Sequence, residues 1–186
     1  MIRSVFILTL FITILSIELK AQNSKVITFD QLEQYTFEGN NLRQILETEG
    51  GKGELSTIFQ NHGEFSCVKD DRIEKLEWCE LETTGLKVNF LNNIAFNILK
   101  ISTDQYSLKL NGKPITVGMS ISELKALLPK LEKTKESRIV NKGHFGQRRV
   151  DMFVYWIGVE NSYTTLSYEY DRLTEAITEI TLYVYN

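Results

Sequence analysis

The chain has 186 residues and a formal net charge of −3, and 42% of its residues are hydrophobic and 11% aromatic. This composition is typical of one globular domain of ordinary size, or of two small halves that share a core. The acidic balance argues against nucleic acid as the general partner, because a surface that binds phosphates needs clustered cations.

Residues 1–21 have the three-part pattern of a secretory signal peptide. Arg3 supplies a positive start, residues 4–17 form an apolar and hydroxyl run, and the end of the segment suits cleavage after Ala21 or Gln22. The run is shorter than the ~20 residues that a spanning helix needs, and no cysteine near the cut could carry a lipid. We therefore expect an exported protein, periplasmic or extracellular, without a stable membrane anchor after cleavage.

Residues 22–39 form a lead-in of unassigned structure, and the first predicted helix follows. An asparagine, Asn40 or Asn41, can cap a helix that runs to Glu49, and the glycine-rich residues 50–53 end it. Beyond the helix the hydrophobic period changes to two, which is typical of strands. The pattern predicts strands at residues 54–60, 64–68, 73–82, 86–91 and 94–101.

Residues 102–119 are predicted to connect two halves of the chain through a hairpin. Asn111-Gly112 is a strong turn signal between strands at residues 106–110 and 113–117. Ser120 and Glu123 then form a capping box that begins a second helix, which Pro129 ends. The last predicted strands are residues 149–158, 163–170 and 176–185.

The two halves, residues 40–101 and 120–186, follow the same plan of a helix and then strands. Two local matches support a relation between them: Leu42–Leu46 with Leu124–Leu128, and the spacing Trp78 to Phe90 with Trp156 to Tyr168. We therefore predict an α+β fold of two tandem helix-plus-antiparallel-meander repeats with a period of about eighty residues. They would share a mostly antiparallel sheet with the helices on one face. Chance similarity between any two helix-and-strand segments is the alternative.

The segment Ile115–Leu124, followed by a proline-ended helix and a meander, carries a resemblance to known domains. It resembles the G-M-S-x-x-E-L opening of small exported helix-plus-meander domains. These include outer-membrane assembly lipoproteins of the BamE type and, in duplicated form, the β-lactamase inhibitor protein. The resemblance implies binding to another protein rather than catalysis. The chain lacks the lipid-bearing cysteine of the assembly lipoproteins.

Cys67 and Cys79 are the two cysteines of the chain. In an exported protein such a pair is first interpreted as a disulfide. The polar residues 69–72 between them suit a turn, and a hairpin turning near residue 73 would place the cysteines opposite each other. Neither cysteine has the CxxC spacing or the histidine neighbours of a metal or redox site, so we predict a structural disulfide.

The two histidines, His62 and His144, occupy corresponding places in the proposed repeats. They could form a pH-responsive or metal-binding pair, but two histidines are few ligands for zinc, and loop histidines at coincidental positions are the preferred interpretation. No GxSxG nucleophile motif occurs, and residues 50–53 lack the spacing of a phosphate loop. We therefore expect no catalytic residue, cofactor or metal.

Charge is distributed unevenly along the chain. Between Asp30 and Glu82 there are thirteen acidic and five basic residues, whereas residues 130–149, interpreted as a loop, hold seven basic and two acidic ones. Such asymmetry can steer an oppositely charged partner or let the protein pair with itself, bind anionic lipid or cell-wall polymer, or merely keep a solvated loop soluble.

The second half is also rich in tyrosine, which suits both interfaces and strands. The candidate partner-binding residues are Lys133, Lys135, Arg138, Arg148, Arg149, Tyr168 and Tyr170. The leading hypothesis is an exported non-catalytic binding module for another envelope or secreted protein, acting through an open sheet face and the basic segment. A small-molecule or polysaccharide binder using sheet-face aromatics is the alternative, and an exported hydrolase comes third.

Overall fold

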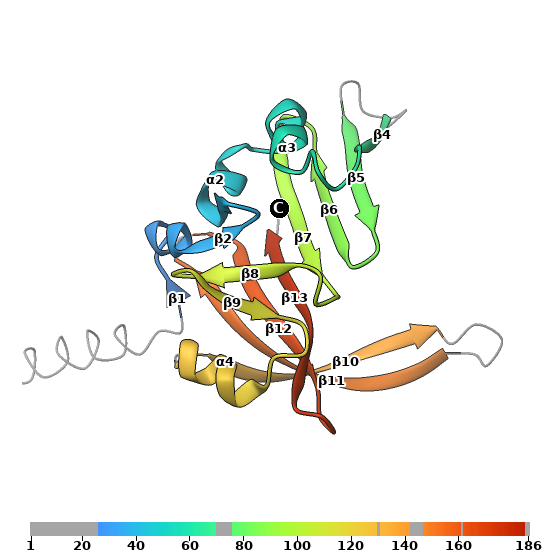
Figure 1. Ribbon diagram of the computed structural model, residues 1–186. Coiled ribbons are helices and arrows are strands. Elements are labelled where there is room, and N and C mark those ends of the chain that lie inside the picture. The colour runs from blue at the N-terminus through green and yellow to red at the C-terminus, as the bar shows by residue number, and fades with distance from the viewer. Residues whose placement is uncertain (1–25, 70–75, 130, 142–146, 161, 185–186) are drawn as a thin grey trace, which may run out of the picture.

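A computed structural model describes residues 26–69, 76–129, 131–141, 147–160 and 162–184 (Figure 1). For residues 132–141 and 147–153 it describes the backbone but not the side chains. The expected signal peptide, the turn near residue 73 and His144 therefore lie outside the described residues. Among the described residues, no helix combines the length and the apolar character needed to cross a membrane.

Up to residue 110, the described part of the chain contains three short helices and eight strands or strand fragments. In chain order the elements are β1 (Val26–Ile27), the 3-10 helix η1 (Asp30–Gln34), β2 (Tyr35–Phe37), β3 (Asn40–Asn41), α2 (Leu42–Glu47), α3 (Lys52–Ile58), β4 (Ser66–Lys69), β5 (Glu77–Thr83), β6 (Leu86–Leu91), β7 (Ala95–Ile101) and the first strand of the hairpin, β8 (Ser107–Leu110).

The second half contains one helix and a long meander. Its elements are β9 (Lys113–Thr116), α4 (Ile121–Leu127), β10 (Glu132–Asn141), β11 (Gln147–Val159), β12 (Thr164–Asp171) and β13 (Ala176–Val184).

The strands form two sheets. The large sheet has nine strands in the order β1-β11-β12-β13-β7-β6-β5-β4, with β10 also paired to β11, and the small sheet has the order β3-β2-β8-β9. Among the described strands, only the short β1–β11 pairing is parallel. The meanders β4–β7 and β10–β13 meet where β7 pairs with β13, with Leu99 opposite Leu182. The predicted α+β class and the mostly antiparallel sheet are therefore confirmed.

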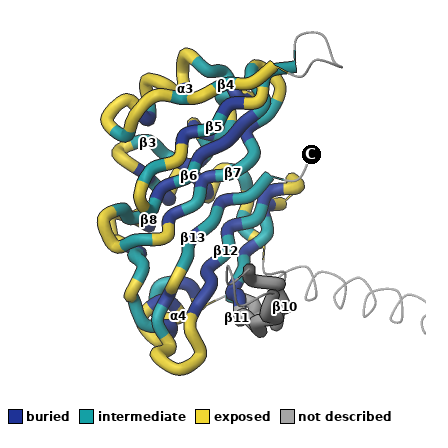
Figure 2. Tube along the Cα trace, turned by 90° about the vertical axis from the view of Figure 1, so that its right-hand side faces the viewer, coloured by how far each residue is buried: buried dark blue, intermediate teal, exposed yellow. Residues whose placement is uncertain are grey.

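One face of the large sheet packs on the core. On β6, for example, Val88 and Phe90 are fully buried, as period-two alternation requires. The small sheet and the helices cover this face, and Figure 2 shows α3, β3, β8 and α4 on the same side of the large sheet. The buried side chains of both sheets and of the helices form one hydrophobic cluster.

Two helix starts follow the sequence closely. The Asn41 side chain accepts a hydrogen bond from the Gln44 amide at the start of α2. At the start of α4 the capping box is complete, because Ser120 accepts from the Glu123 amide and Glu123 accepts from the Ser120 amide. A cap of this kind contributes about 1 kcal/mol.

The expectation of a strand at residues 54–60 is wrong, because residues 52–58 form helix α3. Leu55 and Phe59 are fully buried, and they lie one helical turn apart. Thr57 donates its hydroxyl hydrogen bond to the Gly53 carbonyl, four residues back. The spacing of the apolar residues was helical rather than alternating.

The basic segment at residues 130–149 is not a loop, because most of it lies in the paired strands β10 and β11. The register runs from Glu132 opposite Trp156 to Asn141 opposite Gln147. β12 pairs with β11 only from Phe153 to Gly158. The rest of the β10–β11 hairpin therefore extends beyond β12 as a two-stranded arm, which Figure 1 shows projecting from the sheet.

Candidate functional site

The second face of the large sheet has no helix or second sheet against it in the described part of the chain (Figure 2). We call it the outer face. Its side chains alternate with the core positions of each strand. They are Trp78, Glu80 and Glu82 of β5, Lys87, Asn89 and Leu91 of β6, Ile98 and Lys100 of β7, Glu179, Thr181 and Tyr183 of β13, Thr165, Ser167 and Glu169 of β12, and Val154, Trp156 and Gly158 of β11.

One part of the outer face is aromatic and aliphatic. Trp78 is 40% exposed and lies opposite Leu91 in the β5–β6 register. Ile98 and Tyr183 lie opposite each other where β7 meets β13, and both are half-buried. Covering large apolar side chains with a partner removes them from water and so lowers the free energy. Exposed apolar patches of this kind are typical of binding surfaces.

A neighbouring part of the outer face is charged. The Lys87 ammonium lies 2.7 Å from a Glu80 oxygen and 2.9 Å from a Glu82 oxygen, and Lys100 pairs with Glu179. The hydrogen bonds that Lys87 donates to Glu80 and Glu82 raise the pKa of Lys87, and the one that Glu82 accepts lowers the pKa of Glu82. The ion pairs hold these side chains in fixed positions beside the apolar part.

Asn89 lies on β6 between these two parts. Only 5% of it is exposed, yet its Oδ1 has no hydrogen-bond partner in the described part of the chain. A buried acceptor without a partner costs about 1–3 kcal/mol. Alternation in residues 86–90 already placed Asn89 on the polar face, but its burial depends on neighbours from other strands.

The two candidate tyrosines of β12 do not lie on the outer face. Tyr168 is fully buried and Tyr170 is 7% exposed, because they share the Leu166 side of the strand, which faces the core. Burial raises the pKa of Tyr168 well above its ordinary value, and Tyr170 stacks on Tyr155 with ring centroids 5.5 Å apart. Both are core residues and cannot be surface contacts in this fold.

The five candidate basic residues lie together on the β10–β11 hairpin. Lys133, Lys135 and Arg138 belong to β10, and Arg148 and Arg149 to β11. The register places Arg149 opposite Ile139, beside Arg138. The fold thus joins two basic stretches of the sequence on one hairpin.

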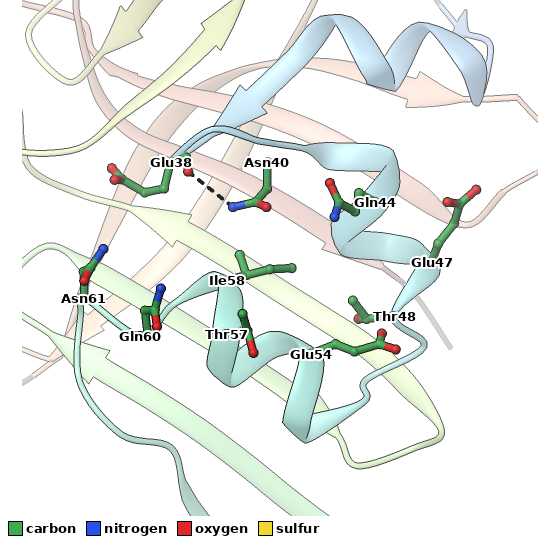
Figure 3. Close-up of a pocket in the computed structure, with 10 residues that line it drawn as sticks. All are labelled: Glu38, Asn40, Gln44, Glu47, Thr48, Glu54, Thr57, Ile58, Gln60 and Asn61. Carbon is green, nitrogen blue, oxygen red and sulfur yellow. Dashed lines mark hydrogen bonds between the residues drawn. The ribbon is translucent and has the colours of Figure 1, made fainter.

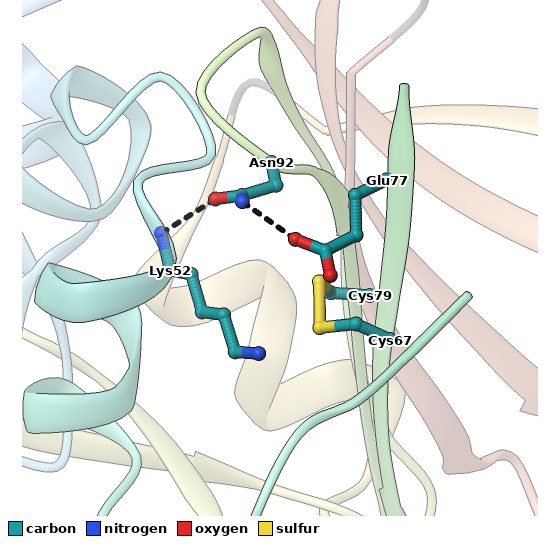
Figure 4. Close-up of a disulfide and its surroundings, with 5 residues drawn as sticks. All are labelled: Lys52, Cys67, Glu77, Cys79 and Asn92. Carbon is teal, nitrogen blue, oxygen red and sulfur yellow. Dashed lines mark hydrogen bonds between the residues drawn. A yellow bond between two sulfur atoms is a disulfide. The ribbon is translucent and has the colours of Figure 1, made fainter. Parts of the chain in front are cut away.

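The predicted disulfide is present. Cys67 and Cys79 are directly opposite in the β4–β5 register, with Cα atoms 4.1 Å apart. Beside it, Asn92 donates to Glu77 at 2.8 Å and accepts from the Lys52 amide at 3.2 Å (Figure 4). Glu77 and the two sulfur atoms lie close together, but sulfurs bonded to each other supply no thiolate for a metal.

His62 lies in an aromatic cluster rather than in an open loop. Its ring lies 5.3 Å from that of Tyr106 and 6.1 Å from that of Phe37, and its side chain is 11% exposed. Nε2 lies 3.9 Å from a Glu38 oxygen. Because His144 lies outside the described residues, the structure does not test the histidine pair, which is the less favoured interpretation of the sequence.

A groove of about 650 Å³ separates α2 from α3. Figure 3 shows Ile58 at its centre, with polar side chains around it. The groove is lined by Glu38, Asn40, Gln44, Glu47, Thr48, Glu54, Thr57, Ile58, Gln60 and Asn61, which include three glutamates and no lysine or arginine. The groove could not be predicted while residues 54–60 were expected to form a strand, because helix α3 is one of its two walls.

In comparisons with known proteins, no family model, curated protein or solved structure matches the chain.

Proposed function

We propose that this protein is an exported, non-catalytic binding module that acts on another envelope or secreted protein. The observation that carries the proposal is the outer face of the large sheet, where Trp78, Leu91, Ile98 and Tyr183 are at least partly open to solvent. Aromatic residues are enriched where proteins bind one another, and a rim of fixed charges gives such a contact its orientation. The basic arm lies at one end of this sheet and would extend the contact.

Export is part of the proposal and rests on two observations. The first 21 residues have the pattern of a signal peptide. The Cys67–Cys79 disulfide is compatible with the oxidising conditions outside the cytoplasm.

We also infer that the two halves are copies of one helix-plus-meander unit. Both helices begin at a side-chain cap, Asn41 in α2 and Ser120 in α4. Each helix buries its first and fourth residues, which are Leu42 and Ile45 in α2 and Ile121 and Leu124 in α4. Aligned on the caps, Leu42 corresponds to Ile121 rather than to Leu124.

The meanders share a second, independent feature. The β6–β7 register shifts between Asn89 and Phe90, and the β12–β13 register shifts between Glu169 and Tyr170. Asn89 and Glu169 are both buried polar residues. A bulge has a specific position in a strand and is not a general property of meanders, so its recurrence supports a duplicated unit. It also supports the resemblance to duplicated domains of the β-lactamase inhibitor type.

The groove between α2 and α3 favours a second candidate function. Amide, hydroxyl and carboxylate side chains converge there, and a polar groove can bind a small molecule or a glycan. Beside the groove, Nε2 of His62 lies 3.9 Å from a Glu38 oxygen. An exported hydrolase would use such a pair for general acid–base catalysis.

A pull-down from envelope extract tests the proposed function. The wild-type protein is compared with Trp78→Ser/Leu91→Ser on the outer face and with a variant in which Lys133, Lys135, Arg148 and Arg149 are changed to Glu. Lys109→Glu/Lys113→Glu, on the small sheet, is the control. We expect a protein that the wild type and the control retain, the outer-face variant loses and the arm variant binds less. Absence of such a protein would contradict the proposal and would direct the work to metabolite and glycan screens on the groove.

A further inference from the structure

We propose that the α2–α3 groove binds the basic β10–β11 arm of a second copy of this chain. The groove carries three glutamates and no cation among its lining residues. The strands β10 and β11 carry Lys133, Lys135, Arg138, Arg148 and Arg149 against Glu132, Glu136 and Asp151. Beyond the Lys135–Phe153 pair, the described part of the arm itself holds Arg138, Arg148 and Arg149 against Glu136 and Asp151. The groove is separate from the outer face, whereas the arm is also part of the proposed partner contact, so a variant of the groove is the one that distinguishes the two proposals.

Within the described part of the chain, few cations neutralise the negative charges of the groove carboxylates. Glu54 has no hydrogen-bond or ion-pair partner in the described part of the chain, and the sole ion-pair partner of Glu38 there is His62, with Nε2 3.9 Å away. Glu47 pairs with Arg43 at 2.7 Å, but Arg43 also pairs with Asp30 and Glu33. An incoming lysine or arginine would therefore find acceptors, with Ile58 beneath them as an apolar floor (Figure 3).

The arm is an element that needs a partner. Beyond the point where β12 ends its pairing at Phe153, β10 and β11 pair only with each other among the described residues. A two-stranded hairpin alone is marginally stable in water. The arm strands also include the apolar residues Ile139, Val140, Val150 and Met152. A groove with both apolar and acidic lining could cover part of this apolar surface.

The arm cannot reach the groove of its own chain. Figure 1 shows the arm projecting from the lower part of the large sheet, whereas the helix α3 lies at the top of the view. The occupant must therefore come from another copy. Since arm and groove are different surfaces, the contact is head-to-tail, and one such contact leaves one arm and one groove free.

Sedimentation velocity on the exported protein tests this inference, because self-association needs no unidentified ligand. The groove variant is Glu38→Lys/Glu54→Lys. The arm variant changes Lys133, Lys135, Arg148 and Arg149 to Glu. A third protein combines both sets of changes, and Asp104→Lys/Glu160→Lys is the control with the same charge change at exposed positions outside the groove. Circular dichroism verifies that each variant is folded.

We expect the wild type and the control to associate at low ionic strength as concentration rises, and to dissociate at ~1 M salt, where charges are screened within about 3 Å. Each single-surface variant should stay monomeric, and the combined variant should associate again. A wild type that is monomeric at every concentration would overturn the inference, and so would association that the groove variant leaves unchanged. The groove variant should still retain the outer-face partner in the pull-down, so the two proposals can fail separately.

Discussion

At the scale of single residues, Asn89 is the position where folding and binding make opposite demands. Its Oδ1 is buried on the outer face without a partner in the described part of the chain. Such a group lowers the stability of the free protein. A partner that donates a hydrogen bond to Oδ1 would recover that loss, so the cost is understandable if the outer face is normally covered.

We predict that Asn89→Leu raises the stability of the free protein by about 1 kcal/mol, because it removes an unsatisfied acceptor and keeps the branching and heavy-atom number of the side chain. Denaturant unfolding of the wild type and the variant measures the difference. Asn89→Asp is the control and should be destabilised, since it buries a charge in the same place. A less stable Asn89→Leu protein would show that the amide contributes to the fold.

The sequence placed individual side chains by alternation but could not tell which face was the core. Tyr168, Tyr170 and Leu166 were correctly assigned to one face. They proved to be core residues, because the small sheet and the helices cover that face. Those elements come from distant parts of the chain, and no local pattern indicates where they pack.

At the scale of elements, the capping box of α4 was predictable because all its determinants are local. The Ser120 side chain and amide donate hydrogen bonds to Glu123 and lower its pKa. A carboxyl with a lowered pKa in the folded state stabilises the protein above its unfolded pKa, and this contribution is lost as pH falls through the folded value.

Ser120→Ala should therefore destabilise the protein by about 1 kcal/mol at neutral pH. The difference from the wild type should shrink as the solution is acidified below the pKa of Glu123. Thermal unfolding of both proteins across this pH range measures it. Ser122→Ala, in the same turn, is the control and should have a smaller effect. A difference that stays constant with pH would show that Glu123 does not take part.

The disulfide links β4, the edge strand of the large sheet, to its neighbour β5. Its loop has a sequence separation of 12, and in the chain-entropy model closing such a loop contributes about 3 kcal/mol. We predict that Cys67→Ala/Cys79→Ala loses stability of this order in denaturant unfolding. Intact mass after thiol labelling of the wild type should show two reactive thiols only after reduction. Labelled thiols before reduction would contradict the assignment.

The helix α3 and the β10–β11 arm show where element prediction failed. Leu55, Ile58 and Phe59 have helical spacing, but the glycines around Lys52 suggested an end of structure rather than a second helix. In β10, the charged residues are interspersed with Thr134, Ile139 and Val140, which favour strands. The charge pattern obscured that preference.

At the scale of the whole molecule, the composition and period-two patterns were sufficient for the α+β class and the meanders. They could not predict the pairing of β2 with β8, which joins Thr36 to Lys109, or that of β7 with β13. Such long-range pairings decide which sheet face stays open. The groove and the outer face therefore became visible only in the assembled fold.

The central claim is that the outer face binds another protein. A photo-crosslinking amino acid at Trp78, in cells that export the protein, tests it most directly, with the same group at the exposed Lys109 of the small sheet as the control. We predict a discrete crosslinked protein at position 78, identified by mass spectrometry, and none at position 109. No crosslink at position 78, or the same products at both positions, would contradict the account.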